Sequence, residues 1–300
     1  MTTKRHSEAV LSDLRDHWWH SDYLELVAKR LDLGSYQRVA DIGSGQGHWG
    51  HRLLPLLAPD AQLCGVDMEE SWVEHAQRRA IALGLGERTQ YKVGNAAELP
   101  FDDNSFDLVT CQTLIMHVPS PQVALSEMLR ILKPGGRILL SEPSNLPNQF
   151  SSDTVQRAMS PKEVSQIANL FVSCSRGRAN LGRGDDSVAD VLPELMSAVG
   201  LSDIEIFQND RCAAMQPPYS EAEQGQLAEE LGHSKSGFWL WNKEDAKALY
   251  EAGQGESAQF ELCYQTFLRQ GKVFEEQVQS ATYARTGGGF HYLLSGVVLA

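Results

Sequence analysis

The chain has 300 residues, of which 42% are hydrophobic and 22% charged, a balance that is ordinary for a globular protein. Its net charge of −13 would repel a phosphate backbone, and its basic clusters, Lys4–Arg5 and 176–183, are short, so we expect no nucleic-acid partner. The first ten residues, MTTKRHSEAV, contain no apolar run, so we expect no targeting leader, and no apolar stretch approaches the length of a membrane span. Five dispersed cysteines without a C-x-x-C pair indicate free thiols, and we expect a cytoplasmic protein.

Strand-like and helix-like segments alternate through the first half. Apolar spacing over 7–33 predicts two short helices, which end at Gly34. Strands are predicted at 38–42, 62–66, 89–93, 106–111 and 137–141, and helices at 48–57, 70–83 and 121–132. This alternation predicts a doubly wound α/β domain with a mostly parallel sheet and right-handed crossovers.

The second half is less regular. Helices near 161–172 and 187–199 precede a strand at 203–207, a long helical region at 219–286 and a last strand at 291–299, which makes seven strands. Because the closing strand must pair beside its neighbour, we interpret 219–286 as a helical insertion. The predicted parts are N-terminal cap helices (1–35), an α/β core (36–218), the insertion (219–286) and the last core strand (287–300).

The segment 38–50 predicts a strand, a turn and a helix. The apolar run Val39–Ile42 ends at three alternating glycines, Gly43, Gly45 and Gly47. Glycine is favoured where the backbone turns with positive φ and lets a ligand approach closely. The turn therefore predicts a nucleoside-like cofactor.

Two classes of cofactor fit these glycines. From Gly45 the sequence matches G-x-G-x-x-G, the dinucleotide pattern of a nicotinamide-dependent oxidoreductase. From Asp41 it matches D-x-G-x-G-x-G, with a carboxylate at the end of the strand. A carboxylate disfavours a pyrophosphate but attracts the sulfonium and ammonium groups of S-adenosylmethionine (SAM). Charge favours SAM, and the oxidoreductase is the alternative.

Five segments in order resemble class I SAM-dependent methyltransferases: VADIGSGQG, CGVDMEE, VGNAAELPFDDNSFDLV, TCQTLIMHVP and LRILKPGGRILLSEP. The resemblance covers about residues 36–143. It is to the small-molecule branch, methyltransferase type 11, which includes the enzymes of ubiquinone and menaquinone biosynthesis. It implies a Rossmann-like α/β fold, SAM as cofactor and methyl transfer to a small-molecule acceptor.

Candidate cofactor-binding residues follow from the strand ends, where ligands of open α/β sheets gather. Asp67 ends the second strand, where its carboxylate can accept both ribose hydroxyls, and Met68 can pack on the adenine. Asn95 stands where the family usually has an acid, and its amide can still accept from the adenine amine. The whole predicted set is Asp41, Gly43, Ser44, Gly45, Gly47, Asp67, Met68, Asn95, Ala96 and Gln112.

Methyl transfer needs proximity and, if the acceptor carries a proton, a base. His117 follows the fourth strand and Glu142 ends the fifth, so these are the candidate catalytic residues; His20 is weaker. The alternative roles are an ordinary loop histidine and a turn partner. Histidine pairs at 17/20 and 48/51 have no third ligand nearby, so we predict no metal site.

Aromatic side chains lie in both the N-terminal segment and the insertion: Trp18, Trp19, Tyr23, Phe238, Trp239 and Trp241. One hypothesis is that they form a lid over an apolar or aromatic acceptor and exclude water. Equally, they can fill the core of a helical subdomain or form a homodimer contact. Because the base is uncertain, a non-catalytic SAM-binding sensor or scaffold is a further alternative.

Overall fold

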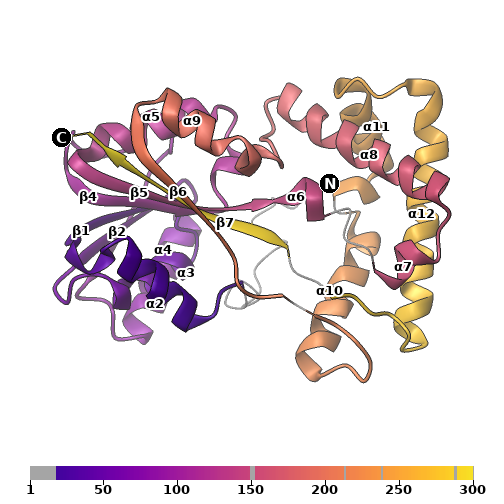
Figure 1. Ribbon diagram of the computed structural model, residues 1–300, viewed down its shortest axis with the longest axis horizontal. Helices are drawn as coiled ribbons and strands as arrows, with labels where there is room; N and C mark the ends of the chain where they lie inside the picture. The colour runs from indigo at the N-terminus through magenta and orange to yellow at the C-terminus, as the bar shows by residue number, and fades with distance from the viewer. Residues whose placement is uncertain (1–17, 149–152, 213, 238, 287–288, 300) are drawn as a thin grey trace.

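The computed structural model describes residues 18–148, 153–212, 214–237, 239–286 and 289–299 (Figure 1). One seven-stranded sheet has the order β3-β2-β1-β4-β5-β7-β6. The strands are β1 (Arg38–Ile42), β2 (Gln62–Asp67), β3 (Thr89–Val93), β4 (Phe106–Gln112), β5 (Leu132–Ser144), β6 (Leu201–Gln208) and β7 (Phe290–Val298). The pairings of β7 with β5 and with β6 are antiparallel and the other four pairings are parallel, so the predicted Rossmann-like, mostly parallel α/β sheet is confirmed.

Burial along the strands follows their place in the sheet. Central β1 is buried from Val39 to Ile42, as expected for a parallel strand that is covered on both faces. Edge strand β3 is mostly exposed, and its sequence TQYKV is correspondingly polar. Alternate residues of β1 join different cores, since Val39 packs in one apolar cluster and Ala40 in another.

Helices cover the two faces of the sheet. Helices α2 (Ser21–Arg30) and α3 (His48–Leu53) pack in the cluster that contains Val39. Because β1-α3-β2 and β2-α4-β3 progress in the same direction, right-handed crossovers place α4 (Glu70–Ala82) on that face too. Helices α5 (Pro121–Ile131) and α9 (Leu192–Ala198) cover the other face.

The second part of the molecule is a helical subdomain, at the right of Figure 1. It contains α7 (Thr154–Arg157), α8 (Pro161–Asn180), α10 (Glu221–Ser236), η6 (Trp239–Trp241), α11 (Lys243–Ala252) and α12 (Ser257–Gln279). Two segments of the chain therefore build it, one before β6 and one after.

This composition differs from the predicted boundary at 218, which assigns α8 to the core. Buried residues of α8, including Ile167 and Leu170, share one apolar cluster with Leu249 of α11 and Phe260 of α12. The reason is packing across a long sequence separation. An apolar face predicts that a helix is buried, but not which partner covers it.

Paired linkers join the subdomain to the sheet. Met215 and Arg285 exchange two backbone hydrogen bonds of 2.9 Å, and Thr154 N–H donates to the carbonyl of Ala284 at 3.1 Å.

Among the described helices, none is both long and apolar enough to cross a membrane.

Candidate functional site

The glycine turn after β1 adopts the predicted conformation. Gly43, Gly45 and Gly47 have φ of +66°, +49° and +74°. A Cβ at Gly43 would lie 2.7 Å from Cδ1 of Leu114, and a Cβ at Gly47 would lie 2.6 Å from the hydroxyl of Tyr91. A Cβ at Gly45 would meet no described atom within 4 Å, so side chains close the turn at Gly43 and Gly47 and leave it open in the middle. An open middle is where a ligand can approach the backbone.

Asp41 is buried beside this turn, with 1% of its surface exposed. Its Oδ2 accepts the backbone N–H of Gly50 at 3.1 Å, while its Oδ1 is buried without a hydrogen-bond partner in the part of the chain that the structure describes. Burial raises the pKa of Asp41 to about 7. A cation at this place would compensate for the lost hydration of the carboxylate.

Asp67 links the end of β2 to the turn. Its Oδ2 accepts the N–H of Gly45 at 2.8 Å, and its Oδ1 accepts the N–H of Glu69 at 3.0 Å. Burial raises the pKa of Asp67. Each oxygen retains a further lone pair, which suits the two hydroxyls of a ribose. Met68 beside it is 71% exposed.

Asn95 begins the loop between β3 and β4, and its side chain is already used in a turn. Its Oδ1 accepts the N–H of Ala97 at 2.9 Å. Asn95 itself is exposed, and the neighbouring Ala96 is half-buried. The predicted contact with an adenine amine would therefore share this oxygen with Ala97.

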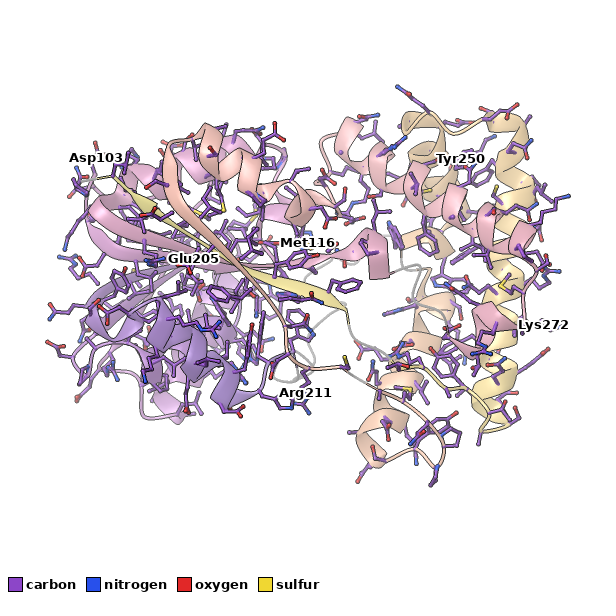
Figure 2. All side chains as sticks on the ribbon, viewed as in Figure 1. Asp103, Met116, Glu205, Arg211, Tyr250 and Lys272 are labelled. Carbon is purple, nitrogen blue, oxygen red and sulfur yellow. The ribbon has the colours of Figure 1, made fainter. Side chains whose placement is uncertain are left out.

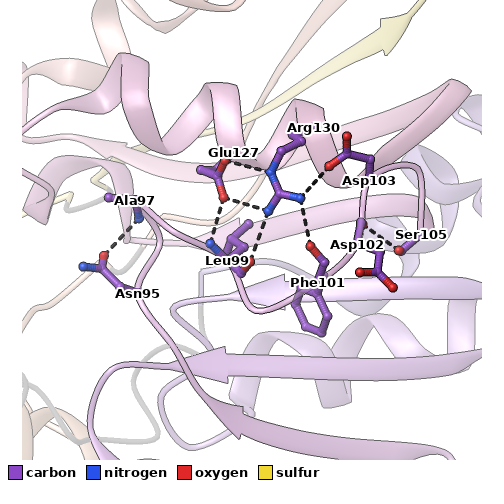
Figure 3. A network of polar contacts seen from close by, with 9 residues as sticks. All are labelled: Asn95, Ala97, Leu99, Phe101, Asp102, Asp103, Ser105, Glu127 and Arg130. Atoms are coloured by element: carbon purple, nitrogen blue, oxygen red, sulfur yellow. Dashed lines mark hydrogen bonds and ion pairs between the residues drawn. The ribbon is translucent and has the colours of Figure 1, made fainter.

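Arg130 of α5 fixes the rest of that loop (Figure 3). Its guanidinium donates to the carbonyls of Leu99 and Phe101 at 3.1 and 2.8 Å and pairs with Asp103 and Glu127 at 2.8 Å. Glu127 in turn accepts the N–H of Leu99 at 2.8 Å. These contacts lower the pKa of Glu127 and raise that of Arg130. The loop that carries Asn95 is thus held against α5 without a crossover helix of its own.

Gln112 ends β4 next to the glycine turn, because Ile42 and Cys111 are register partners on neighbouring strands. Gln112 is 6% exposed and Ser44 is 7% exposed. Their side-chain oxygens Oε1 and Oγ, like Oδ1 of Asp41, have no partner within the described residues. Buried polar atoms are nearly always hydrogen-bonded, so three orphans at adjoining strand ends mark a polar ligand site. The donor set fits SAM: carboxylates for its cations and hydroxyls, and an open glycine backbone.

Sequence reasoning missed two residues behind the turn. The hydroxyl of Tyr91 lies 2.6 Å from Nε2 of His51, and both side chains contact the position where Gly47 lacks a Cβ. Burial lowers the pKa of His51 to about 4 and raises that of Tyr91. The available signal was Gly65, which lies opposite Tyr91 in the sheet and leaves room for its ring.

In the described chain no group of three His, Cys, Asp or Glu side chains is placed to hold a metal ion.

Glu142 and His117 lie at the same turn. Oε1 of Glu142 accepts the N–H groups of Leu114 and Ile115, each at 2.8 Å, while its Oε2 is buried with no partner among the described atoms. Burial raises the pKa of Glu142 to about 7. His117 ends the 3₁₀ turn η4 (Ile115–His117) and is half-buried. Its neighbour Met116 lies on the side of the sheet that faces the helical subdomain (Figure 2).

His20 lies elsewhere. Its Nδ1 pairs with Oδ2 of Asp210 at 2.7 Å, and its side chain is 52% exposed. The pair connects the start of α2 with the segment that follows β6. Strand β6 forms one edge of the sheet, and β3 forms the other.

The aromatic residues expected to form one lid lie in two separate clusters. Trp19 is 1% exposed and packs on the sheet, and the Trp18 ring lies tilted against His291, with ring centroids 4.5 Å apart. Trp239 and Trp241 pack in the helical subdomain. The ring centroids of Trp239 and Phe171 are 5.2 Å apart, and those of Trp241 and Phe267 are 4.5 Å apart. Phe238 lies outside the described residues. The structure therefore does not bring the two sets together.

Comparison with known proteins identifies the family. The profile of a methyltransferase domain matches residues 33–183, half of the chain. The ubiquinone/menaquinone biosynthesis C-methyltransferase UbiE of Dinoroseobacter shibae is 36% identical over 139 residues, 46% of this chain and 55% of that protein. A demethylmenaquinone methyltransferase of Geobacillus kaustophilus is 33% identical over 136 residues, 45% and 56% of the two chains. The chain spans about half the length of these relatives.

Solved structures resemble the fold at low sequence identity. YcgJ of Bacillus subtilis is 19% identical with a TM-score of 0.51, and the match covers 94% of this chain and 100% of that one. A candidate methyltransferase of Bacillus halodurans is 18% identical with a TM-score of 0.52, covering 92% and 99%. The chain therefore belongs to the methyltransferase-domain family, and the predicted class I SAM-dependent methyltransferase is confirmed at the level of family and fold.

Proposed function

We propose that this protein binds SAM at the carboxyl ends of β1, β2 and β4 and transfers its methyl group to a small molecule. The observation that carries the proposal is the buried Asp41 carboxylate, whose Oδ1 has no partner within the described residues and which lies beside an open glycine turn. Family membership and the names of the relatives support methyl transfer over the nicotinamide alternative, which uses the same glycines.

Four of the predicted cofactor residues would hold the methyl donor through different groups. Asp67 would accept the ribose hydroxyls while it keeps the N–H of Gly45, and Met68 would cover the adenine. Asp41 and Gln112 would face the charged methionine end, because they flank the turn on adjacent strands. When bound, SAM supplies a methyl group on a sulfonium that is ready for direct displacement. The protein's own contribution is to orient the reactants and exclude water.

A proton acceptor is needed only if the methyl acceptor carries a proton. Glu142 suits this role because burial raises its pKa to about 7 and because its Oε2 makes no hydrogen bond to the described atoms. His117 at the same turn is the second candidate. An apolar or aromatic acceptor and a cytoplasmic location complete the proposal; five free cysteines support that location.

Calorimetry with S-adenosylhomocysteine, the demethylated donor, tests the proposal. Wild-type protein should bind it, and Asp41→Asn, which keeps the shape but removes the charge, should bind about tenfold more weakly, equivalent to ~1.4 kcal/mol. Asp60→Asn, at an exposed aspartate before β2, is the matched control and should bind normally.

Three outcomes oppose parts of the proposal. Absence of binding to S-adenosylhomocysteine, together with tight binding of NAD, would support the oxidoreductase. Equal affinity of Asp41→Asn and wild type would remove the electrostatic argument. Binding without methyl transfer to any acceptor in a broad screen would leave a sensor or scaffold.

A further inference from the structure

The helical subdomain contains a cavity of about 430 Å³ between α7, α8, α10, η6 and α12. We propose that this cavity is a second ligand site, for a neutral aromatic small molecule that carries a carbonyl or hydroxyl oxygen. None of the predicted methyl-donor or catalytic residues lines it. The inference therefore goes beyond methyl transfer and does not depend on it.

The walls of the cavity are aromatic and fixed by packing. Its phenylalanine, tryptophan and tyrosine rings are Phe171, Trp239, Trp241, Phe267, Phe274 and Tyr283. They contact one another in pairs, with ring centroids 5.2 Å apart for Phe171–Trp239, 4.5 Å for Trp241–Phe267 and 4.8 Å for Phe274–Tyr283. The volume lies within the range of small-molecule pockets, and such walls suit a flat apolar ring.

Gly271 of α12 keeps one wall in place. A Cβ at this position would lie within contact of the Trp241 ring, so the indole packs directly on the helix backbone. A ring held this closely has little freedom to collapse into the cavity, which makes the space a preformed one.

Charges at the cavity argue against an anionic ligand. Arg285 pairs with both oxygens of Glu230, at 2.8 and 3.3 Å, and the hydroxyl of Tyr283 donates to Asp153 at 3.2 Å. Among the described lining residues, the guanidinium of Arg285 is thus already neutralised by Glu230, a second carboxylate, that of Asp153, lies nearby, and the imidazole of His233 completes the titratable groups. Arg285, Glu230 and Asp153 together leave net negative charge, which disfavours a ligand anion in a partly desolvated place.

The indole N–H of Trp239 in the cavity wall can donate a hydrogen bond to a ligand oxygen. Nε1 of Trp239 is buried and has no hydrogen-bond partner among the residues that the structure describes. Buried donors are nearly always paired, and an indole N–H can only donate. A carbonyl or hydroxyl oxygen on an aromatic ligand would satisfy this donor while the ring fills the apolar walls.

Binding of two bicyclic probes tests the proposal on the full chain. The probe 1-tetralone has an aromatic ring and a carbonyl, and tetralin has the same skeleton without oxygen. Saturable quenching of tryptophan fluorescence should show that 1-tetralone binds at least fivefold more tightly than tetralin. The anion 1-naphthoate should bind at least tenfold more weakly than 1-tetralone.

Two variants assign the binding to this cavity. Trp239→Phe keeps a ring but removes the N–H, so the preference for 1-tetralone over tetralin should disappear. Trp72→Phe, in α4 beside the sheet, is the matched control and should keep it. Gln270→Phe places a ring in the cavity and should abolish binding of both probes, with an unchanged circular dichroism spectrum.

The proposal is overturned if neither probe shows saturable binding to wild type. It is equally overturned if Trp239→Phe retains the preference, or if folded Gln270→Phe binds 1-tetralone as wild type does. Binding of S-adenosylhomocysteine is measured separately on the same samples. Failure at one site is therefore distinguishable from failure at the other.

Discussion

Asp41 illustrates how a single buried side chain can link the stability of the fold to the binding of a cationic ligand. Its pKa in the folded protein, about 7, exceeds the 3.8 of an exposed aspartate because burial disfavours the charged form. The protonated form therefore stabilises the fold, and that contribution is lost as the pH rises from about 4 through 7. A cationic ligand needs the charged form, so stability and ligand affinity respond to pH in opposite directions.

For this reason, wild-type protein without ligand should lose stability between pH 5.5 and 8, and Asp41→Asn should lose about 1–2 kcal/mol less. Chemical denaturation at the two pH values measures the difference. Affinity of wild type for S-adenosylhomocysteine should rise over the same interval. A variant that shows the full wild-type pH dependence of stability would contradict the assignment to Asp41.

Glu142 has a structural and a candidate chemical role, and one substitution separates them. Glu142→Gln keeps an oxygen for the N–H groups of Leu114 and Ile115, so the turn should remain folded. If Glu142 is the base, kcat should fall at least ~100-fold while donor affinity changes less than threefold. The wild-type rate should rise from pH 6 to 8 as the carboxyl ionises. Retained activity in Glu142→Gln would leave Glu142 as a turn partner and move the test to His117.

At the scale of elements, the loop between β3 and β4 depends on one side chain of α5. Arg130 contacts two loop carbonyls and Asp103 with a planar fork of donors, a geometry that lysine lacks. Arg130→Lys should therefore destabilise the fold by about 1–3 kcal/mol and weaken S-adenosylhomocysteine binding through the Asn95 loop. The matched control is Arg78→Lys, in an exposed pair with Glu74 on α4. Equal thermal midpoints and equal affinities for S-adenosylhomocysteine in the two variants would contradict the role of Arg130 in holding the loop.

A glycine contact determines how closely α8 and α11 approach. A Cβ at Gly177 would overlap the carbonyl of Leu249, and one at Gly253 would overlap the carbonyl of Ser173. Gly177→Ala should destabilise by about 1–3 kcal/mol despite the better helix propensity of alanine. Gly225→Ala in α10, where the added Cβ would meet no described atom within 4 Å, should instead stabilise by up to ~1 kcal/mol. Denaturation curves of both variants measure the change in the free energy of unfolding. A change of the same sign in both variants would contradict the prediction.

At the scale of the whole molecule, two separate chain segments form one apolar core. The region from α10 to α12 covers residues of α8 such as Ile167 and Leu170. Replacement of 221–279 by a short flexible linker should therefore expose this face and give a protein that binds a hydrophobic dye and aggregates. Additional removal of 154–180 should restore solubility. A monomeric single deletion without dye binding would instead support an independent insertion.

Much of the fold, and the glycine turn of the candidate cofactor site, could be predicted from local sequence. The strand at 38–42, the helix at 70–83 and the strand at 89–93 differ by at most one residue from β1, α4 and β3. Their apolar periodicity reflects burial by immediate neighbours, and a glycine at positive φ has few substitutes. The roles of all the predicted cofactor-binding and catalytic residues, Asn95, His117 and Glu142 among them, stay predictions.

The spacing of glycines, the acid before them and the alternation of strands with helices determined the parallel sheet and the family from the sequence alone. Only the tertiary structure decided that His51 meets Tyr91, that α8 joins the helices after β6, and that Trp19 and Trp239 pack in two different cores. The physical reason is the sequence separation between the residues that contact one another. Periodicity reports that a face is buried, whereas the partner that buries it is selected by packing between segments far apart in the chain.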